Sequence, residues 1–271
     1  AKEKIAASLA EFERHGLAEG AQRTSTLGRI TTTTELEDAG SAELVIEAVT
    51  EDLALKLDIF SALDRICPPP AILASSSGQP ASALVAKMRH RERVIATHFW
   101  YPPQLIPLVE VCVGPATDPD VTPWVVAILK RIGKEPAIID QEVPGFIGNR
   151  LQFAMLREAW SLWASGAAGA EAIDTLVRNS FGRRLGITGP IESADVGGLF
   201  TMYHFGKSLM PHLDRSPEPS GKVAQLVALG ANGLANGRGV YDWSKRDGAG
   251  LVGARMDELF RWLKADRQRK A

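Results

Sequence analysis

The chain has 271 residues and a formal net charge of −1, with 31 basic and 32 acidic side chains. Because this balance leaves no strongly basic surface, we expect neither nucleic acid nor an anionic membrane as a partner. The length suffices for one large domain or two ordinary ones. The cysteines, Cys67 and Cys112, show no metal-ligand spacing, so no metal site is expected. They indicate a reducing compartment, and we expect a cytoplasmic protein in which Cys112 is a small buried residue.

The amino-terminal segment AKEKIAASLAEFERHG has a helical rhythm, with Ile5, Leu9 and Phe12 on one face. Charges interrupt each of its apolar stretches, which makes it unlike a secretory signal. No run of about eighteen apolar residues predicts a membrane span. Since the sequence opens at an alanine within a helical pattern, we expect an amino-terminally truncated piece of a longer chain, with a processed terminus as the alternative.

Five apolar runs of strand length follow, with helical patterns between them. The predicted strands are residues 44–49, 71–75, 94–98, 108–113 and 137–139, and the clearest helices are residues 53–66 and 121–132. Solid apolar strands that alternate with helices are typical of a mostly parallel sheet covered on both faces. The pattern therefore predicts an α/β, Rossmann-like domain.

After Asp140 the pattern becomes helical. Pro144 opens a helix that runs to Trp163, since proline is well tolerated at a first helical position. Further helices are predicted at residues 171–179, 196–210, 221–230 and 254–264. We therefore expect two domains, residues 1–142 and an all-α domain of residues 143–271. The Pro144 helix is apolar on more than one face, which predicts burial in its own domain or against a second subunit.

His98 and Glu110 form the most informative pair of polar residues. They lie twelve positions apart in VIATHFWYPPQLIPLVEVCV, in two apolar runs joined by a proline-rich connector. The connector is too short for a helical crossover, so the two strands should pair antiparallel or lie adjacent at the far edge of the sheet. A carboxylate beside an imidazole sets its tautomer and makes it a general base. The alternative is a structural histidine, but Glu110 would still need a partner if buried.

Several motifs occur along the chain in a defined order. They are ILASSSG, ATHFWYPP, IPLVEV, GKEPAIIDQEVPGFIGNR and GPIESADVGGL. Their order and spacing resemble the NAD-dependent 3-hydroxyacyl-CoA dehydrogenases over nearly the whole chain. HFWYPPQLIPLVE, NRLQFA and the late GRGVYDW further resemble the lambda-crystallin and L-gulonate 3-dehydrogenase branch. The resemblance implies NAD as cofactor and a homodimer formed through the carboxy-terminal helices.

The resemblance also implies roles for individual residues. His98 matches the catalytic base of the family and Glu110 the carboxylate that orients it. Ser77 matches a serine that hydrogen-bonds the substrate oxygen, although a capping role for Ser77 is equally compatible with the sequence. Asn149, on the first turn of the Pro144 helix, matches an asparagine that positions the substrate beside the base.

Cofactor contacts are implied around the segment IEAVTEDLALK. Ala48, Glu51 and Lys56 match the family pattern at the end of a predicted strand and in the helix that follows. Nucleotides bind outside the carboxyl ends of parallel strands in open α/β sheets. Lys56 could contact ribose or phosphate oxygens, with an ordinary solvated helix lysine as the alternative. Ser77 and Tyr101 complete the set of expected cofactor contacts.

Three departures from the family pattern stand out. No G-x-G-x-x-G occurs in the chain, nor an acidic residue about twenty positions after such a loop. The serine motif is one residue shorter, so that Gly78 competes with Ser77 for the matching position. Tyr101 stands where the family has an asparagine, and its bulk bears on the identity of the substrate.

These features predict an enzyme that oxidises the 3-hydroxy group of a 3-hydroxyacyl-CoA, such as 3-hydroxybutyryl-CoA, with NAD. One alternative is a dehydrogenase of L-gulonate or another small hydroxy acid, because no basic cluster clearly marks a site for the coenzyme A tail. Another is a non-catalytic relic that kept the fold and the dimer surface without the glycine loop.

Overall fold

The computed structural model describes residues 1–270 and divides into two compact units. The sheet unit comprises residues 1–148 together with the chain from residue 253 onward, and the helical unit comprises residues 149–252. The predicted domain boundary at residues 142–143 stays a prediction. No helix within residues 1–270 is long and apolar enough to cross a membrane.

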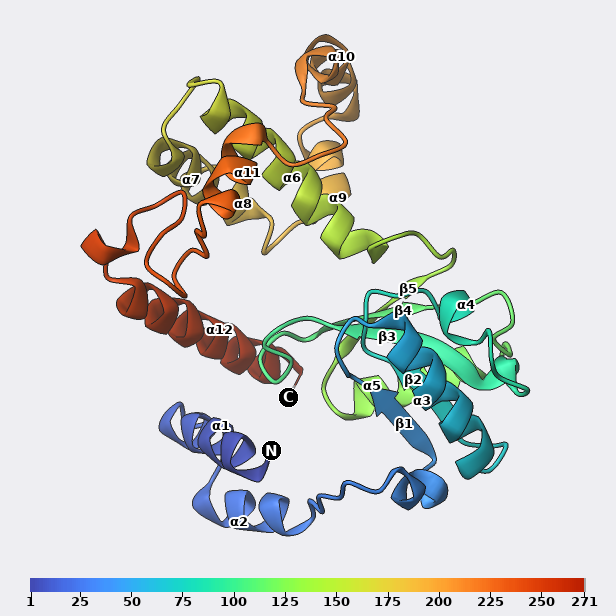
Figure 1. Ribbon diagram of the computed structural model, residues 1–271. Helices are drawn as coiled ribbons and strands as arrows, with labels where there is room; N and C mark the ends of the chain where they lie inside the picture. The colour runs from blue at the N-terminus through green and yellow to red at the C-terminus, as the bar shows by residue number, and fades with distance from the viewer. Residues whose placement is uncertain (271) are drawn as a thin grey trace. The chain divides into compact units, whose positions relative to one another are not determined.

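A five-stranded sheet forms the centre of the sheet unit (Figure 1). Its strands, in spatial order, are β1 (Leu44–Glu47), β2 (Ile72–Ser75), β3 (Val94–Phe99), β4 (Leu108–Cys112) and β5 (Glu135–Ile139). The first three strands run parallel, and β4 and β5 run parallel to each other. The pairing of β4 with β3 is antiparallel. Since the other pairings are parallel, the sheet is mostly parallel, as the sequence predicts.

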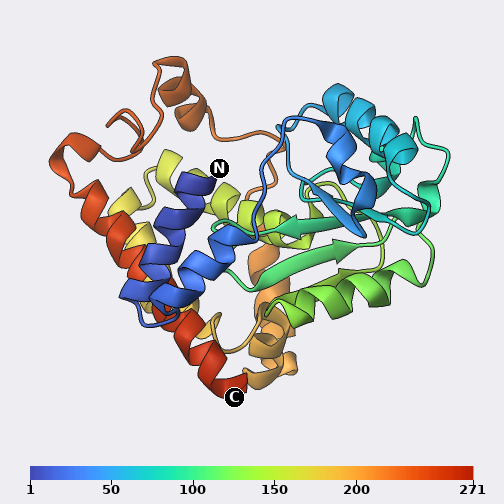
Figure 2. The same cartoon turned by 90° about the horizontal axis from the view of Figure 1, so that it is seen from below.

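Helices cover both faces of the sheet, and the apolar residues of each strand alternate between them. Leu73 packs with Phe60 and Leu63 of α3, whereas the next strand position, Ala74, packs with Val125 of α5 on the opposite face. Figure 2 shows the strands between the two helices. The helices of this part are α3 (Leu53–Ile66), α4 (Ala81–Leu84) and α5 (Val121–Arg131), with 3-10 turns η1 (Leu36–Ser41) and η2 (Arg91–Arg93).

The first turn of α3 is set by Asp52. This residue is the N-cap, and its side chain accepts hydrogen bonds from the backbone N–H groups of Ala54 and Leu55. Such a cap pairs donors that the helix itself leaves free. The cap fixes where α3 begins and therefore which residue, Lys56, lies over the carboxyl end of β1.

The first of two amino-terminal helices packs with the carboxy-terminal one. The helices are α1 (Lys2–Arg14), α2 (Gly20–Gly28) and α12 (Gly248–Lys270). Phe260 of α12 is buried, contacts the ring of Phe12 edge-on and stacks on His15 with ring centroids 3.9 Å apart. These contacts explain why the end of α12 groups with the sheet unit, although the sequence pattern places it with the later helices.

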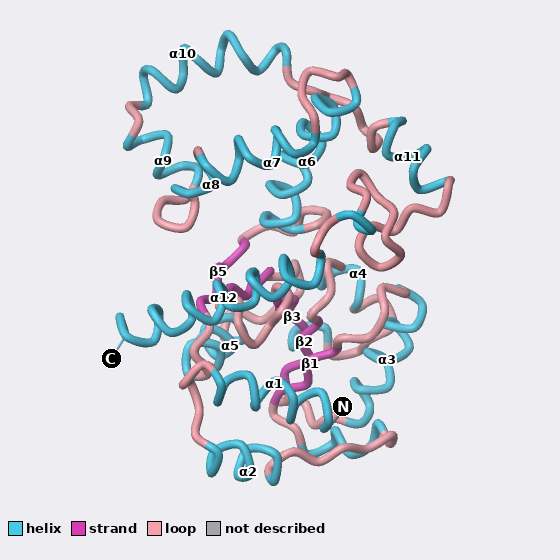
Figure 3. The backbone as a smooth tube through the Cα atoms, turned by 90° about the vertical axis from the view of Figure 1, so that its left-hand side faces the viewer, coloured by secondary structure: helices cyan, strands magenta, loops and turns pink. Residues whose placement is uncertain are grey.

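The helical unit consists of helices and the loops that join them (Figure 3). They are α6 (Phe146–Ala164), which starts in the sheet unit, then α7 (Ala170–Asn179), α8 (Phe181–Arg184), α9 (Pro190–Val196), α10 (Leu199–Leu209), η3 (Met210–His212), α11 (Gly221–Ala228) and η4 (Trp243–Lys245). The predicted helix 196–210 is wrong at its start. Gly198 has φ +90°, a conformation that suits glycine and ends the helical path between α9 and α10.

Candidate active site

The strand register brings His98 and Glu110 opposite each other. In the antiparallel pairing of β3 with β4, His98 is the direct partner of Glu110. Directly opposed residues carry their side chains on the same face of a sheet. His98 Nδ1 lies 2.8 Å from Glu110 Oε2. The predicted antiparallel pairing is confirmed, and the backbone ladder itself holds this dyad together.

Three donors converge on the Glu110 carboxylate, which is 3% exposed. Besides His98, the indole Nε1 of Trp100 donates to Oε2 at 3.1 Å. The backbone N–H of Gly148 donates to Oε1 at 2.8 Å. Gly148 lies in the first turn of α6, where backbone N–H groups have no partner within the helix. Glu110 therefore caps α6 and is itself held in one orientation beside the imidazole.

Trp100 and Gly148 are site residues that the sequence analysis missed. A side chain at Gly148 would overlap with the indole of Trp100, since an added Cβ would collide with Trp100 Cζ2. The close approach of helix and indole thus requires glycine at this position. Both residues lie inside motifs quoted above, ATHFWYPP and PGFIGNR, and that position was the available signal.

The imidazole of His98 is mostly covered, with 15% of its side chain exposed. The ring of Phe146 lies 5.7 Å away and that of Trp100 lies 5.9 Å away, measured between centroids. Since an ionised carboxylate only accepts hydrogen bonds, Nδ1 of His98 carries the proton shared with Glu110. The other ring nitrogen, Nε2, then has a free lone pair and can accept a proton.

The connector between β3 and β4 is held by Lys134. Its ammonium donates to the carbonyl oxygens of Pro103 and Ile106, the latter at 3.0 Å. Burial lowers the pKa of Lys134. Tyr101, on the same connector, is 89% exposed. Its predicted contact with a cofactor stays a prediction.

Ser77 lies at the same end of the sheet as His98, where the parallel strands β2 and β3 finish. β2 and β3 run parallel with Ser75 opposite Ala96, so two positions further along each path stand Ser77 and His98. Ser77 is buried, and its Oγ lies 2.9 Å from Ser75 Oγ. It also accepts the backbone N–H of Gln79 at 3.3 Å. Ser77 therefore takes part in a local turn, and its contact with a ligand stays a prediction.

Lys56 is fully buried, so the alternative of an ordinary solvated lysine is wrong. Its Nζ lies 2.8 Å from Glu47 Oε1 and 3.2 Å from the carbonyl oxygen of Val49. Glu47 ends β1 directly under the first turn of α3, which explains the pairing. A buried charge needs such a partner. The ammonium faces Glu47, and a direct contact of Lys56 with a cofactor stays a prediction.

The space beyond the carboxyl ends of β1 and β2 could hold part of a nucleotide. Ala48 and Glu51 are exposed there, and the space beside Gly78 is open, with no heavy atom within 4 Å of an added Cβ. An exposed carboxylate can accept hydrogen bonds from ribose hydroxyls, so the chemistry of these residues fits a ribose of NAD. The backbone cradle that a G-x-G-x-x-G loop offers to a pyrophosphate is not part of this sequence.

Asn149 directly follows Gly148 in the first turn of α6, as the sequence predicts, and is half-buried. The predicted start of this helix at Pro144 is wrong, because Pro144 and Gly145 form a turn in which Gly145 has φ +78°, and α6 begins at Phe146. Cys112 is buried, also as predicted, and burial raises the pKa of its thiol to about 11. Among residues 1–270, no group of three or more His, Cys, Asp or Glu side chains could hold a metal ion.

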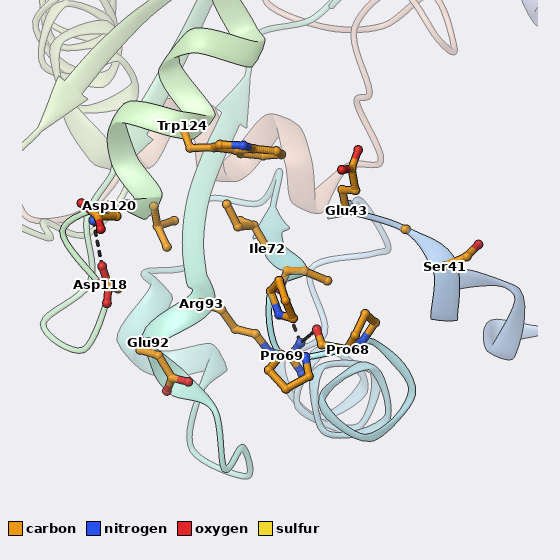
Figure 4. A pocket seen from close by; sticks show the side chains of 14 residues that line it. Ser41, Glu43, Pro68, Pro69, Ile72, Glu92, Arg93, Asp118, Asp120 and Trp124 are labelled. Carbon is orange, nitrogen blue, oxygen red and sulfur yellow. Dashed lines mark hydrogen bonds between the residues drawn. The ribbon is translucent and has the colours of Figure 1, made fainter.

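A cavity of about 510 Å³ lies at the other end of the strands from the dyad, where β2 and β3 begin. Figure 4 shows Trp124 on one side of it, and Arg93 with Pro68 on the other. Arg93 is buried and donates to the carbonyl oxygen of Pro68 at 2.7 Å and to Asp64 Oδ1 at 2.9 Å. The guanidinium fastens the triple-proline loop to the start of β3, and the whole length of β3 separates this cavity from the dyad.

Two family models match the chain. One, 3-hydroxyacyl-CoA dehydrogenase, NAD binding domain, matches residues 1–143, and the other, 3-hydroxyacyl-CoA dehydrogenase, C-terminal domain, matches residues 145–243. The chain belongs to the 3-hydroxyacyl-CoA dehydrogenase family. It is an oxidoreductase of this NAD-dependent family, and its first part is the family's NAD-binding domain. The resemblance drawn from the motifs is confirmed.

Relatives of this dehydrogenase are named for different substrates. L-carnitine dehydrogenase of Streptomyces griseus is 35% identical over 257 residues, which cover 92% of this chain and 76% of the relative. A probable 3-hydroxybutyryl-CoA dehydrogenase of Bacillus subtilis is 36% identical over 236 residues, covering 84% and 81%. The crystal structure of 5-formyl-3-hydroxy-2-methylpyridine 4-carboxylic acid 5-dehydrogenase superposes with a TM-score of 0.82 at 27% identity, covering 87% of this chain and 77% of that one. Family membership alone therefore does not fix the substrate.

Proposed function

We propose that this dehydrogenase oxidises the 3-hydroxy group of a 3-hydroxyacyl-CoA, such as 3-hydroxybutyryl-CoA, to the 3-keto form with NAD. The observation that carries the proposal is the His98–Glu110 dyad, whose 2.8 Å contact lies at the edge of the sheet where parallel strands end. The probable 3-hydroxybutyryl-CoA dehydrogenase among the relatives supports the substrate class.

His98 is the general base of the proposed reaction. Its Nε2 takes the proton of the substrate hydroxyl, and Glu110 stabilises the imidazolium that forms. Trp100 and Gly148 hold Glu110 in place, so that the imidazole keeps its tautomer and direction. Asn149 positions the substrate beside the base in this proposal.

Bound NAD supplies the acceptor for the hydride that leaves the carbon bearing the hydroxyl. In the proposal, Ala48, Glu51, Ser77 and Tyr101 hold its nicotinamide half at the carboxyl ends of β1, β2 and β3. Lys56 forms an ion pair with Glu47 and so stabilises the end of β1 next to this site.

A small 3-hydroxy acid is the second candidate substrate. L-carnitine dehydrogenases match this chain as well as the hydroxybutyryl-CoA enzymes do, at 35% identity over 92% of its length in one case. The L-gulonate branch, which the sequence motifs resemble, belongs to the same class. Tyr101, in place of the usual asparagine, favours a substrate that differs from the ordinary acyl-CoA.

Formation of NADH with 3-hydroxybutyryl-CoA, L-carnitine and L-gulonate as separate substrates tests the proposal. Preferred turnover of the acyl-CoA supports the first candidate, and preferred turnover of either hydroxy acid replaces it by the second. If none of the three is oxidised by a folded preparation, the non-catalytic alternative gains and the proposed activity fails.

The proposal includes a cytoplasmic homodimer that forms through the helical unit. Its support is the apolar surface of α9 and α10, where Val196, Phe200 and Tyr203 are exposed. Exposed apolar residues that lie on neighbouring helices are typical of association surfaces. Light scattering of the purified protein should give twice the monomer mass, and Phe200→Asp should shift it toward the monomer. A monomeric parent protein would contradict the dimer.

A further inference from the structure

A buried hydrogen-bond chain runs from α3 to Ser77. Glu47 and Ser75 are direct partners in the parallel pairing of β1 with β2, and both are buried. Lys56 contacts Glu47 Oε1 at 2.8 Å, Ser75 Oγ contacts Glu47 Oε2 at 2.7 Å, and the two serine oxygens lie 2.9 Å apart. We call Lys56, Glu47, Ser75 and Ser77 the serine relay. Neither Glu47 nor Ser75 stands out in the sequence as a site residue.

The direction of the relay follows from its charged end. Glu47 is paired with the Lys56 ammonium, and its Oε1 also accepts the backbone N–H of Val49 at 2.7 Å. A carboxylate in such a pair only accepts hydrogen bonds. The 2.7 Å contact between Ser75 Oγ and Glu47 Oε2 must therefore use the single hydroxyl proton of Ser75.

The proton of Ser77 is fixed by the same reasoning. Since Ser75 has given its proton to Glu47, its oxygen can only accept from Ser77, whose backbone N–H also points at it from 3.3 Å. The hydroxyl proton of Ser77 is thus committed to Ser75. Gln79 N–H occupies one remaining lone pair of Ser77 Oγ, and the other lone pair is left for a ligand. Ser77 meets that ligand as an acceptor.

An acceptor at Ser77 does not suit the reacting oxygen of the substrate. The substrate hydroxyl has one proton, which it donates to the lone pair on His98 Nε2 in the proposed reaction. A hydrogen-bond donor must then come from elsewhere. The nicotinamide nucleotide offers two kinds of donor, the N–H₂ of its carboxamide and the hydroxyls of its ribose.

We propose that Lys56, Glu47 and Ser75 are positioning residues that orient the Ser77 hydroxyl, so that Ser77 accepts a hydrogen bond from the nicotinamide nucleotide. The inference rests on the proposed function, because it takes NAD to bind at the edge where β1 and β2 end. It keeps the cofactor contact of Ser77, adds the direction of its hydrogen bond, and removes the contact with the substrate oxygen that the resemblance implies.

Glu47→Gln tests the direction of the relay with almost no change of shape. The amide oxygen should remain with Lys56 and the Val49 N–H, which places the amide N–H₂ against Ser75 Oγ. Ser75 then donates to Ser77, and Ser77 becomes a donor toward the ligand. NAD affinity, measured by calorimetry, should fall about tenfold, the effect of one hydrogen bond. Unchanged affinity in a folded variant overturns the proposal.

Because Glu47→Gln leaves a buried ammonium without its counter-charge, the variant could lose its fold. The double variant Glu47→Gln with Lys56→Met removes that charge and keeps the reversed relay, so it should show the same loss of affinity. Ser75→Ala should cost about threefold, since Ser77 is then free to rotate. Ser76→Ala is the matched control, because its hydroxyl lies outside the relay, and it should leave the affinity unchanged.

Acetylpyridine adenine dinucleotide distinguishes the two donor groups, since it lacks the carboxamide N–H₂. Binding about tenfold weaker than NAD, with the difference abolished in Glu47→Gln, assigns the carboxamide to Ser77. Equal binding of both nucleotides assigns a ribose hydroxyl, and because such a hydroxyl can reorient to accept, Glu47→Gln should then weaken both nucleotides by less than tenfold.

Neutron diffraction of the deuterated protein provides a readout that needs neither turnover nor cofactor. The deuteron of Ser75 should lie toward Glu47 Oε2, and that of Ser77 toward Ser75 Oγ. The reverse arrangement overturns the relay even if the enzyme is active. A protein with the expected deuterons that neither binds NAD nor oxidises any of the three substrates leaves the relay standing and refutes the proposed function.

Discussion

The sheet unit and the helical unit treat their apolar side chains differently. In the sheet unit, Leu73, Ile95 and Val109 are fully buried between helices that belong to the same unit. In the helical unit, large apolar residues such as Phe200, which is 79% exposed, face outward. The sheet unit therefore holds the dyad beside a core of its own, whereas the helical unit carries apolar surface that the proposed dimer would cover.

The largest expected effect concerns the dyad within the well-packed unit. Replacement of His98 by Gln removes the proton acceptor and should lower kcat/KM by about 10²–10⁴-fold on the preferred substrate. The thermal midpoint should stay close to that of the parent, because the imidazole is not part of the apolar core. His90→Gln, at an exposed histidine, serves as control. Retained turnover in His98→Gln removes His98 from the mechanism.

Core truncations sharpen the comparison between the units. Phe60→Ala deletes a fully buried ring under the sheet and should destabilise the protein by about 3–5 kcal/mol. Phe200→Ala, in the helical unit, should cost less than about 1 kcal/mol at protein concentrations where the chain is monomeric. Urea unfolding measures both. Equal losses would mean that the two units are packed alike.

A methyl group at the start of α6 probes how tightly the dyad is held. Gly148→Ala drives a Cβ into the indole of Trp100 and should cost about 1–3 kcal/mol through overpacking. Activity should fall along with stability, because both donors that hold Glu110 are displaced. Gly166→Ala is not a suitable control, since Gly166 has φ +79°. Gly169, which has open space and no such φ, can be used instead.

The Asp64–Arg93 pair makes the sheet unit sensitive to acid. Burial alone raises the pKa of Asp64, but hydrogen bonds from the Arg89 backbone, the Arg93 side chain and the His90 backbone outweigh it and lower the pKa below its ordinary value of 3.8. The stabilisation is therefore present above about pH 4 and is lost as the pH falls through the lowered pKa. Asp64→Asn should cost about 2 kcal/mol at pH 7 and flatten the acid limb of the stability curve. An unchanged acid limb would contradict this account.

A smaller pH-dependent effect is expected in the helical unit. Tyr241 donates to Asp174 Oδ2 at 2.7 Å, and burial, together with this carboxylate, raises the pKa of Tyr241 to about 12. The contribution is present below pH 10, where the unfolded phenol begins to ionise, and is lost as the pH rises toward 12. Tyr241→Phe should cost about 1 kcal/mol at neutral pH. The difference from the parent should shrink between pH 10 and 12 in denaturant titrations.

The sequence predicted the sheet region well because its signals are local and strong. The helix 53–66 was placed at the bounds observed for α3, and the opposition of His98 and Glu110 followed from a connector too short for a helix. The helical unit was harder, since its helices lack strong stop signals. Gly198 breaks a predicted helix only through its backbone conformation, and α12 extends beyond its predicted ends.

The parts of the site that escaped prediction depend on three-dimensional neighbours. Glu47 sits inside an apolar run and Ser75 at the end of another, but only the register of β1 with β2 shows that they meet. The burial of Lys56 likewise requires α3 to lie over that pair. Trp100 and Gly148 are ordinary in sequence and gain meaning because both donate to one carboxylate.

The antiparallel course of β4 separates the residues that align the dyad from the residues that are proposed to contact the cofactor. Glu110 lies in the middle of a strand, so its alignment with His98 is secured by main-chain ladder bonds on both flanks. Ala48, Ser77 and Tyr101, which are proposed to meet the cofactor, stand instead past the ends of β1, β2 and β3, where loops tolerate insertions and exchanges. In a fold of this kind, substitutions in the loops can change the ligand contacts while the strand pairing that aligns His98 with Glu110 stays the same.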